Sequence, residues 1–140
     1  MKLAICTDVF ADLSYTDMLD KVKSLGIDAV EMTAGGWGAR KHCNTAELLA
    51  DEGKRKEFMG ELEKRGMRIS ALNTSCNPLW PSKTGEEYKK SMYDCATLAG
   101  LLGVKKIVAM AGLPAGNETD TTPNWITSTV SWPDFMAPAY

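Results

Sequence analysis

Polar side chains that suit binding of a sugar lie inside or just after short apolar runs of this sequence. Glu31 lies within the apolar run 29–32, where a carboxylate requires a partner or a polar cavity. Asn73 ends the run 68–73, and Asn77 follows four residues later. A side-chain amide offers one acceptor and two N–H donors, which suits the hydroxyl groups of a polyol. We therefore predict that Glu31, Asn73 and Asn77 bind substrate.

Aromatic and imidazole side chains extend this prediction. Trp37 and Trp80 could stack on a sugar ring, and His42, the one histidine of the chain, could hydrogen-bond a sugar or a phosphate. The glycine-rich stretch 35–38 could present backbone N–H groups to a phosphate, although it is neither a Walker loop nor a dinucleotide fingerprint. No catalytic residue can be assigned, because no triad can be assembled from these side chains.

Structural roles are the alternative for each of these residues. Glu31 could form an ion pair with a lysine or arginine, and Asn77 could only shape the turn before Pro78. His42 could be a solvated loop residue, and isolated tryptophans often serve in packing. These alternatives stay open from the sequence.

Four apolar runs and the stretches between them predict an alternation of strands and helices. The expected strands are residues 3–7, 29–32, 68–73 and 106–110. The expected helices are residues 14–25, 44–50, 54–65 and 84–102. Ser14 with Asp17, and Thr84 with Glu87, resemble capping boxes at helix starts.

Three glycines mark a repeat. Gly26, Gly66 and Gly103 each end an expected helix and come just before an expected strand. Strands that alternate with helices at this period favour parallel βα units and an α/β fold. The strand-to-helix loops are the long ones, and ligands of parallel α/β folds bind at the carboxyl ends of strands.

Composition narrows the classes of function. The chain has 140 residues and a net charge of −2, so a nucleic-acid partner is not expected. No apolar stretch approaches the roughly 20 residues of a membrane span. The four cysteines form no C-x-x-C pair, Cys6 and Cys95 are expected in the core, and a cytoplasmic location is the simplest expectation. Residues 1–111 are expected to form the βα units, and residues 112–140 a Pro/Trp-rich loop segment.

The chain resembles the sugar phosphate isomerase/epimerase family, which belongs to the xylose-isomerase-like TIM barrels. The motifs that carry the resemblance are Val30-Glu31 with Gly35-Gly36-Trp37, Ile69 to Asn73, Asn77-Pro78-Leu79, Gly112 to Gly116, Pro123-Asn124-Trp125 and Ser131-Trp132-Pro133. The resemblance implies four parallel βα units that form half of a (β/α)8 barrel, since a whole barrel needs roughly 250 residues. Residues 112–140 would lead into the missing second half.

The resemblance also implies an activity. Members of the family move a proton beside a sugar carbonyl with the help of a divalent metal, Mn²⁺, Mg²⁺ or Zn²⁺. Most ligands of that metal would lie outside this chain, so the 140-residue chain alone is expected to be inactive. Trp80 stands where relatives commonly have a histidine. The expected partner is a sugar or sugar phosphate.

Two other functions remain open from the sequence. A non-catalytic half-barrel would have open sheet edges at its first and fourth strands and could form a homo-oligomer through them. An endonuclease of the related abasic-site class would need histidines and a basic face, which one histidine and a net charge of −2 do not favour.

Overall fold

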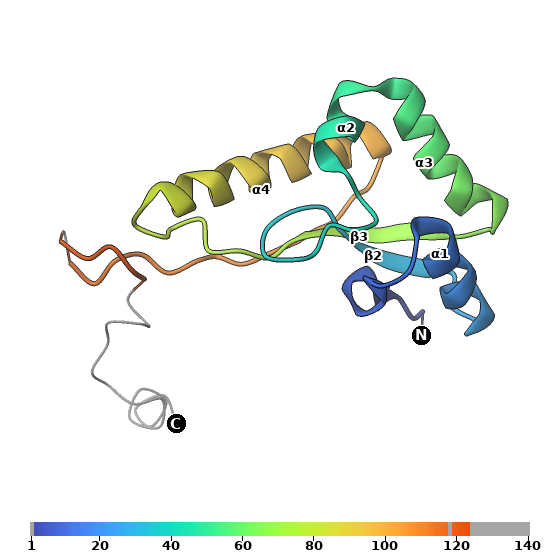
Figure 1. Ribbon diagram of the computed structural model, residues 1–140, viewed down its shortest axis with the longest axis horizontal. Helices are drawn as coiled ribbons and strands as arrows, with labels where there is room; N and C mark the ends of the chain where they lie inside the picture. The colour runs from blue at the N-terminus through green and yellow to red at the C-terminus, as the bar shows by residue number, and fades with distance from the viewer. Residues whose placement is uncertain (1, 118, 124–140) are drawn as a thin grey trace.

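The computed structural model describes residues 2–117 and 119–123 (Figure 1). The predicted Pro/Trp-rich segment 112–140 is therefore described as far as residue 123. The motifs that include Asn124, Trp125 and residues 131–133 lie outside the described residues.

Four parallel strands form one sheet in the order β1-β2-β3-β4. The strands are β1 (Ile5–Cys6), β2 (Ala29–Thr33), β3 (Arg68–Thr74) and β4 (Ile107–Ala109). Each strand lies within one residue of its expected range or inside it. The predicted α/β fold with parallel strands is confirmed, and it is consistent with half of a TIM barrel.

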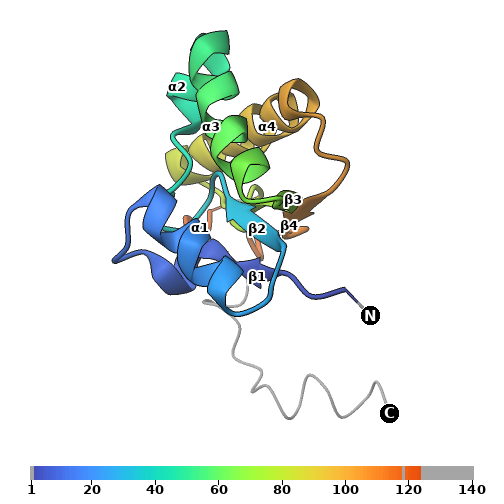
Figure 2. The ribbon, with the colours of Figure 1, turned by 90° about the vertical axis from the view of Figure 1, so that its right-hand side faces the viewer.

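The helices connect successive strands and lie on one side of the sheet. They are the 3₁₀ helix η1 (Thr7–Phe10), α1 (Tyr15–Ser24), α2 (Thr45–Ala50), α3 (Glu52–Lys64) and α4 (Lys83–Leu102). Figure 2, which views the molecule nearly along the strands, shows α1, α3 and α4 around the outside of the curved sheet. We call this side of the sheet the helical face and the opposite side the inner face. The described part of the chain contains no helix with the length and apolarity of a membrane span.

Side-chain caps fix where the helices begin. Ser14 Oγ accepts from the backbone N–H of Asp17 at 3.1 Å and donates to the Asp17 carboxylate at 2.6 Å. Asn44 and Asp51 cap α2 and α3 by accepting the backbone N–H of Glu47 and of Lys54. The predicted capping box of Thr84 and Glu87 is wrong: α4 begins earlier, because the extended Ser82 accepts from the N–H of Thr84 at 3.2 Å.

The three predicted glycine junctions share one hydrogen-bond pattern. Gly26, Gly66 and Gly103 all have φ between +62° and +75°, a conformation that glycine adopts without strain. After each glycine, the next N–H bonds to a carbonyl five residues earlier, as in Ile27 N to Val22 O and Val104 N to Ala99 O. These are Schellman motifs, and they reverse the chain directly into the following strand.

A register shift between β2 and β3 determines which residues of the two strands share a face of the sheet. Val30 pairs with Ile69, but Glu31 pairs with Ala71, so Ser70 is an extra residue on β3. The Ser70 hydroxyl donates to the carbonyl oxygen of Val30 at 2.9 Å. The shift matches Met32 with Leu72 and Thr33 with Asn73.

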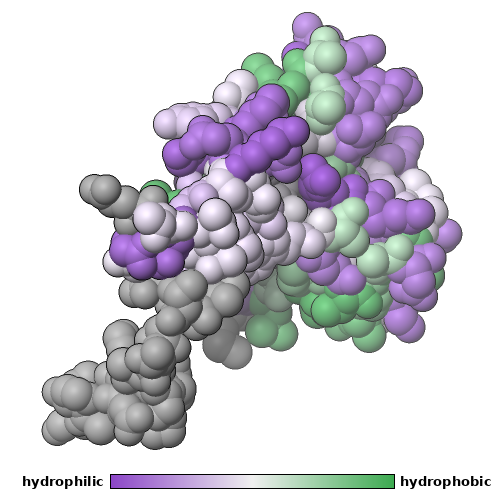
Figure 3. Space-filling model, turned by 60° about the vertical axis from the view of Figure 1, so that its left-hand side comes forward, coloured by the Kyte–Doolittle hydropathy of each residue, from purple (hydrophilic) through white to green (hydrophobic). Residues whose placement is uncertain are grey.

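The hydrophobic core fills the space between the helical face and the helices. Val30, Met32 and Leu72 have 0% exposure and pack in one cluster with residues of α1, α3 and α4, including Val22, Leu62 and Leu98. Figure 3 shows hydrophilic residues over much of this face and hydrophobic residues in patches, the larger of them on the lower part of the view. Some apolar surface therefore remains outside the core.

The described cysteines are all free thiols, and three of them are buried. Burial raises the pKa of Cys43 and of Cys95 to about 11, and it raises the pKa of Cys76 as well. The core position predicted for Cys95 is confirmed. Cys6 is half-buried and pairs with Glu31 across β1 and β2, so it lies on the inner face and not in the core.

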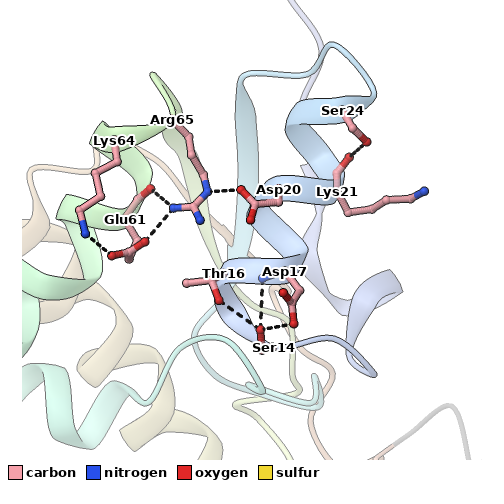
Figure 4. Close-up of polar contacts among 9 residues, drawn as sticks. All are labelled: Ser14, Thr16, Asp17, Asp20, Lys21, Ser24, Glu61, Lys64 and Arg65. Carbon is pink, nitrogen blue, oxygen red and sulfur yellow. Dashed lines mark hydrogen bonds and ion pairs between the residues drawn. The ribbon is translucent and has the colours of Figure 1, made fainter.

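Arg65 connects α1 to the end of α3 (Figure 4). Its guanidinium donates to Asp20 at 2.5 Å and to the carboxylate of Glu61 at 2.7 Å. The hydrogen bond from Arg65 lowers the pKa of Asp20, and hydrogen bonds from Lys64 and Arg65 lower the pKa of Glu61. The two helices are therefore joined by charge-assisted bonds at the rim of their apolar contact.

The substitution Arg65→Met is expected to flatten the acid dependence of stability. Both carboxylates have a lower pKa in the folded chain, so their contribution is present above their ordinary pKa values of 3.8 and 4.5 and is lost as the pH falls through the lowered values. Urea unfolding at a series of pH values measures this. Lys56→Met is the control, because it removes one exposed ion pair, with Glu52, that lies within α3. An equal effect in both variants would contradict the connecting role of Arg65.

Candidate functional site

Polar side chains gather on the inner face at the carboxyl ends of β1, β2 and β3. Paired residues of parallel strands share a face, which places Cys6 beside Glu31 and Thr33 beside Asn73. The Cys6 sulfur lies 3.8 Å from the Thr33 hydroxyl. Glu31 and Asn73, predicted from the sequence as binding residues, are brought together here.

Asn73 holds Glu31 in a defined orientation. The side-chain amide of Asn73 donates to the carboxylate Oε1 of Glu31 at 2.6 Å. The side-chain oxygen Oδ1 of Asn73 in turn accepts the backbone N–H of Ser75 at 2.8 Å. This bond fixes which end of the side-chain amide faces Glu31. The carboxylate is thus pre-oriented by a neutral donor.

The charge of Glu31 has no cationic partner in the described part of the chain. The ion pairs there all join other residues, so the predicted alternative of a structural ion pair does not apply within residues 2–117 and 119–123. Glu31 is half-buried. A half-buried carboxylate held by one amide keeps acceptor capacity for a ligand hydroxyl.

The ends of β1 and β2 form the rim beside this pair. The buried hydroxyl of Thr7 accepts the backbone N–H of Thr33 at 3.3 Å. Gly38 packs against the side chains of Thr33 and Asp8. A Cβ at this position would be 2.2 Å from Thr33 Cγ2 and 2.6 Å from Asp8 Oδ2. The exposed Asp8 carboxylate therefore lies at the same rim as Thr33.

Three N–H groups of the glycine loop after β2 are already bonded within the chain. Gly35 N–H donates to Asn73 O at 3.2 Å, Gly36 N–H to Ser91 Oγ at 2.9 Å, and Trp37 N–H to Ser75 O at 3.0 Å. Gly36 has φ +70° and lies against the Ser75 carbonyl, 2.3 Å from where a Cβ would be. These glycines permit close packing of the loop on β3 and α4.

His42 does not reach the site, contrary to the sequence prediction. It is 6% exposed, and its Nε2 lies 3.1 Å from the carbonyl oxygen of Leu13. It lines a hollow of about 520 Å³ between α1, α2 and α3, on the helical side of the sheet. His42 thus secures the loop before α1 to the loop before α2.

Asn77 is buried, and its side-chain amide bonds to backbone groups of two loops. It is 0% exposed, and its amide donates to Leu113 O at 2.9 Å while its Oδ1 accepts from Leu113 N at 2.8 Å and Leu79 N at 3.2 Å. All of these partners are backbone groups. Asn77 therefore joins the loop after β3 to the loop after β4.

Trp37 and Trp80, the two tryptophans predicted to bind substrate, lie in the loops at the carboxyl ends of the strands. Trp37 is 48% exposed and contacts Tyr88 of α4 edge-to-face, with ring centroids 6.2 Å apart. Trp80 is half-buried, and its backbone lies against Gly85 at the start of α4. The exposed face of Trp37 leaves the predicted stacking role open to test.

The described residues do not complete a metal site. They contain no group of three or more His, Cys, Asp and Glu side chains that could hold an ion. Glu31 offers one carboxylate and Asp8 a second at the rim, and Asn73 and Thr33 are neutral. Residues 2–117 and 119–123 therefore do not fit a resident divalent metal by themselves.

Cys6 is the member of the inner-face cluster that the sequence does not predict. Its apolar neighbours suggest a core position. The alternation of side chains along a strand is the signal that places Cys6 on the face of Glu31.

The chain is similar to the uncharacterized protein YfiH of Bacillus subtilis (strain 168), with 52% identity over 136 residues. The match covers 97% of this chain and 44% of YfiH, so the chain spans less than half the length of this relative. No family profile matches the chain.

Among solved structures, the chain is similar to a probable 3-DHS dehydratase, AsbF, of Bacillus anthracis, involved in petrobactin synthesis. The TM-score is 0.56 at 21% identity, over 80% of this chain and 39% of that one. The likeness establishes the fold. A xylose isomerase domain-containing protein of Salmonella typhimurium LT2 gives a TM-score of 0.47 at 20% identity, over 89% of this chain and 40% of that one.

Replacement of Asn77 tests its structural role. Asn77→Ala is expected to lower the free energy of unfolding by about 1–3 kcal/mol, because it leaves buried backbone groups of residues 79 and 113 without partners. Urea unfolding measures the loss, and hydrogen exchange at the Leu113 N–H should accelerate. Asn117→Ala, at an exposed turn, is the control. Unchanged stability with loss of ligand binding would instead support a binding role.

Proposed function

We propose that this chain forms one half of the substrate-binding rim of a (β/α)8 sugar or sugar phosphate isomerase or epimerase. The observation that carries the proposal is the carboxylate of Glu31, oriented by Asn73 on the inner face at the carboxyl ends of the strands. This is the end at which parallel βα folds bind ligands.

The chemistry of the cluster supports a polyol ligand. Glu31 is an acceptor for ligand hydroxyls, Thr33 has a hydroxyl on the same face, and Asp8 adds a second carboxylate at the rim. Trp37, which is 48% exposed and contacts Tyr88 of α4, would offer an aromatic face for a sugar ring from the loop after β2. Directed hydrogen bonds to hydroxyl groups discriminate strongly against ligands that lack them.

The proposal places the catalytic acid and base, and most ligands of a divalent Mn²⁺, Mg²⁺ or Zn²⁺, outside these 140 residues. Isomerisation requires a proton to leave and rejoin carbon atoms beside a carbonyl, and a single oriented carboxylate does not provide both steps. The chain alone is therefore proposed to bind and not to turn over a sugar.

Glu31→Gln tests the proposal. Glutamine keeps an acceptor for Asn73 but loses the charge, so binding of a responsive polyol or ketose phosphate is expected to weaken about 10–100-fold. Thermal-shift and calorimetric titrations of the 140-residue chain measure this, with Glu57→Gln on the exposed face of α3 as control. Stability should stay within about 1 kcal/mol, because an unpaired carboxylate is removed.

Absence of binding to any polyol or ketose phosphate in the unaltered chain would contradict the proposal. Equal affinity of the Glu31→Gln and Glu57→Gln variants would contradict the role of Glu31 in it.

A non-catalytic module that self-associates is the second candidate function, and exposed apolar residues at the β4 edge favour it. Ile107 is 40% exposed, Val108 37% and Met110 39%, and Tyr93 of α4 is 76% exposed. A hollow of about 390 Å³ lies between α4 and β4, lined by Met92, Tyr93 and Ile107 among others. An open strand edge beside apolar surface can pair with another copy.

Sedimentation tests this second candidate. The unaltered chain should sediment as a dimer across a dilution series, and Val108→Glu should make it monomeric by placing a charge at the edge. Val9→Glu is the matched control, because Val9 is an exposed valine in η1. A monomer at all concentrations would contradict self-association through β4.

A further inference from the structure

Four basic side chains surround one hollow at the amino ends of the strands. The hollow has a volume of about 600 Å³ and is bounded by the residues before β1, the start of β3 and the link from α4 to β4. Lys2, Arg68, Lys105 and Lys106 line it, and all four are exposed. It lies at the opposite rim of the sheet from Glu31 and Asn73.

The charge in this hollow has a single sign. No aspartate or glutamate is among the lining residues, and none of the four basic residues takes part in an ion pair within the described part of the chain. By contrast, the hollow of about 740 Å³ between α4 and the loop before α2 has Glu87 and Asp94 among its lysines and arginine. Like charges held near one cavity repel, and a bound anion removes that repulsion.

The hollow also has an apolar floor. Ile69 and Leu102 line it and are half-buried where they pack on the core. Small-molecule sites commonly enclose about 300–1,000 Å³ and combine apolar walls with a few charged groups. These properties suit a compact ligand with an anionic head and a less polar body.

We propose that this hollow is a binding site for a phosphorylated small molecule. Arg68 offers the planar fork that binds two oxygens of a phosphate, and Lys105 and Lys106 supply point charges beside it. A phosphate ester carries about −1.5 to −2 charges near neutral pH, which matches several unpaired cations better than a single carboxylate does. The site is separate from the proposed sugar site and does not depend on it.

Inorganic pyrophosphate is the probe for this site. It should raise the melting temperature of the 140-residue chain in a concentration-dependent manner, beyond sodium chloride of equal ionic strength. The double variant Lys105→Gln/Lys106→Gln should bind pyrophosphate about tenfold more weakly or not at all. Calorimetric titration gives the affinities.

The control is Lys41→Gln/Lys83→Gln, which removes the same charge at the opposite rim, where both residues are exposed. It should bind pyrophosphate as the unaltered chain does. Equal weakening in both double variants, weakening in the control alone, or no effect of pyrophosphate on the unaltered chain would each overturn the proposal. Loss of polyol binding in Glu31→Gln with pyrophosphate binding intact would separate this site from the proposed function.

Discussion

The extra residue Ser70 between β2 and β3 is the feature on which the candidate site depends. Side chains alternate along a strand, so a shift of one residue moves every later side chain to the other face. Because Ser70 has no pairing partner on β2, Leu72 lies in the core beside Met32, and Asn73 lies on the same face as Glu31. Without the bulge, Leu72 would pair with Thr33, so an apolar core residue of β3 would lie beside a polar inner-face residue of β2. The Ser70 hydroxyl stabilises this arrangement through the carbonyl of Val30.

The helical layer follows from repeated local rules. Each Schellman glycine ends a helix, and only one to three residues separate it from the next strand, so successive units return to the same rim. The long connections consequently lie at the carboxyl ends of the strands. There Asn77 and Ser75 join one loop to another, and Ser91 of α4 holds the glycine loop. One end of the sheet is therefore a set of short turns with exposed lysines, and the other is a hydrogen-bonded set of loops around Glu31.

The elements of the fold were largely predictable because apolar runs and glycine junctions are local signals. β2, β3 and the starts of α1 and α2 were found from such signals, and the proximity of Glu31 and Asn73 followed from parallel strands with converging ends. The bulge at Ser70 was not predictable, because it arises from matching two strands that are far apart in sequence. The burial of His42 and Asn77 was missed for a related reason: their partners, Leu13 and Leu113, are 29 and 36 residues away.

The positions of the thiols give this protein its own reporters of local opening. Cys43 precedes α2, Cys76 follows β3 and Cys95 lies within α4, so each belongs to a different part of the helical side. Buried thiols with raised pKa values react slowly with alkylating reagents near neutral pH, since the thiolate is the nucleophile. The alkylation rate of each cysteine would therefore follow how often its surroundings separate, which distinguishes fraying of the α2 region from opening of α4 without any introduced label.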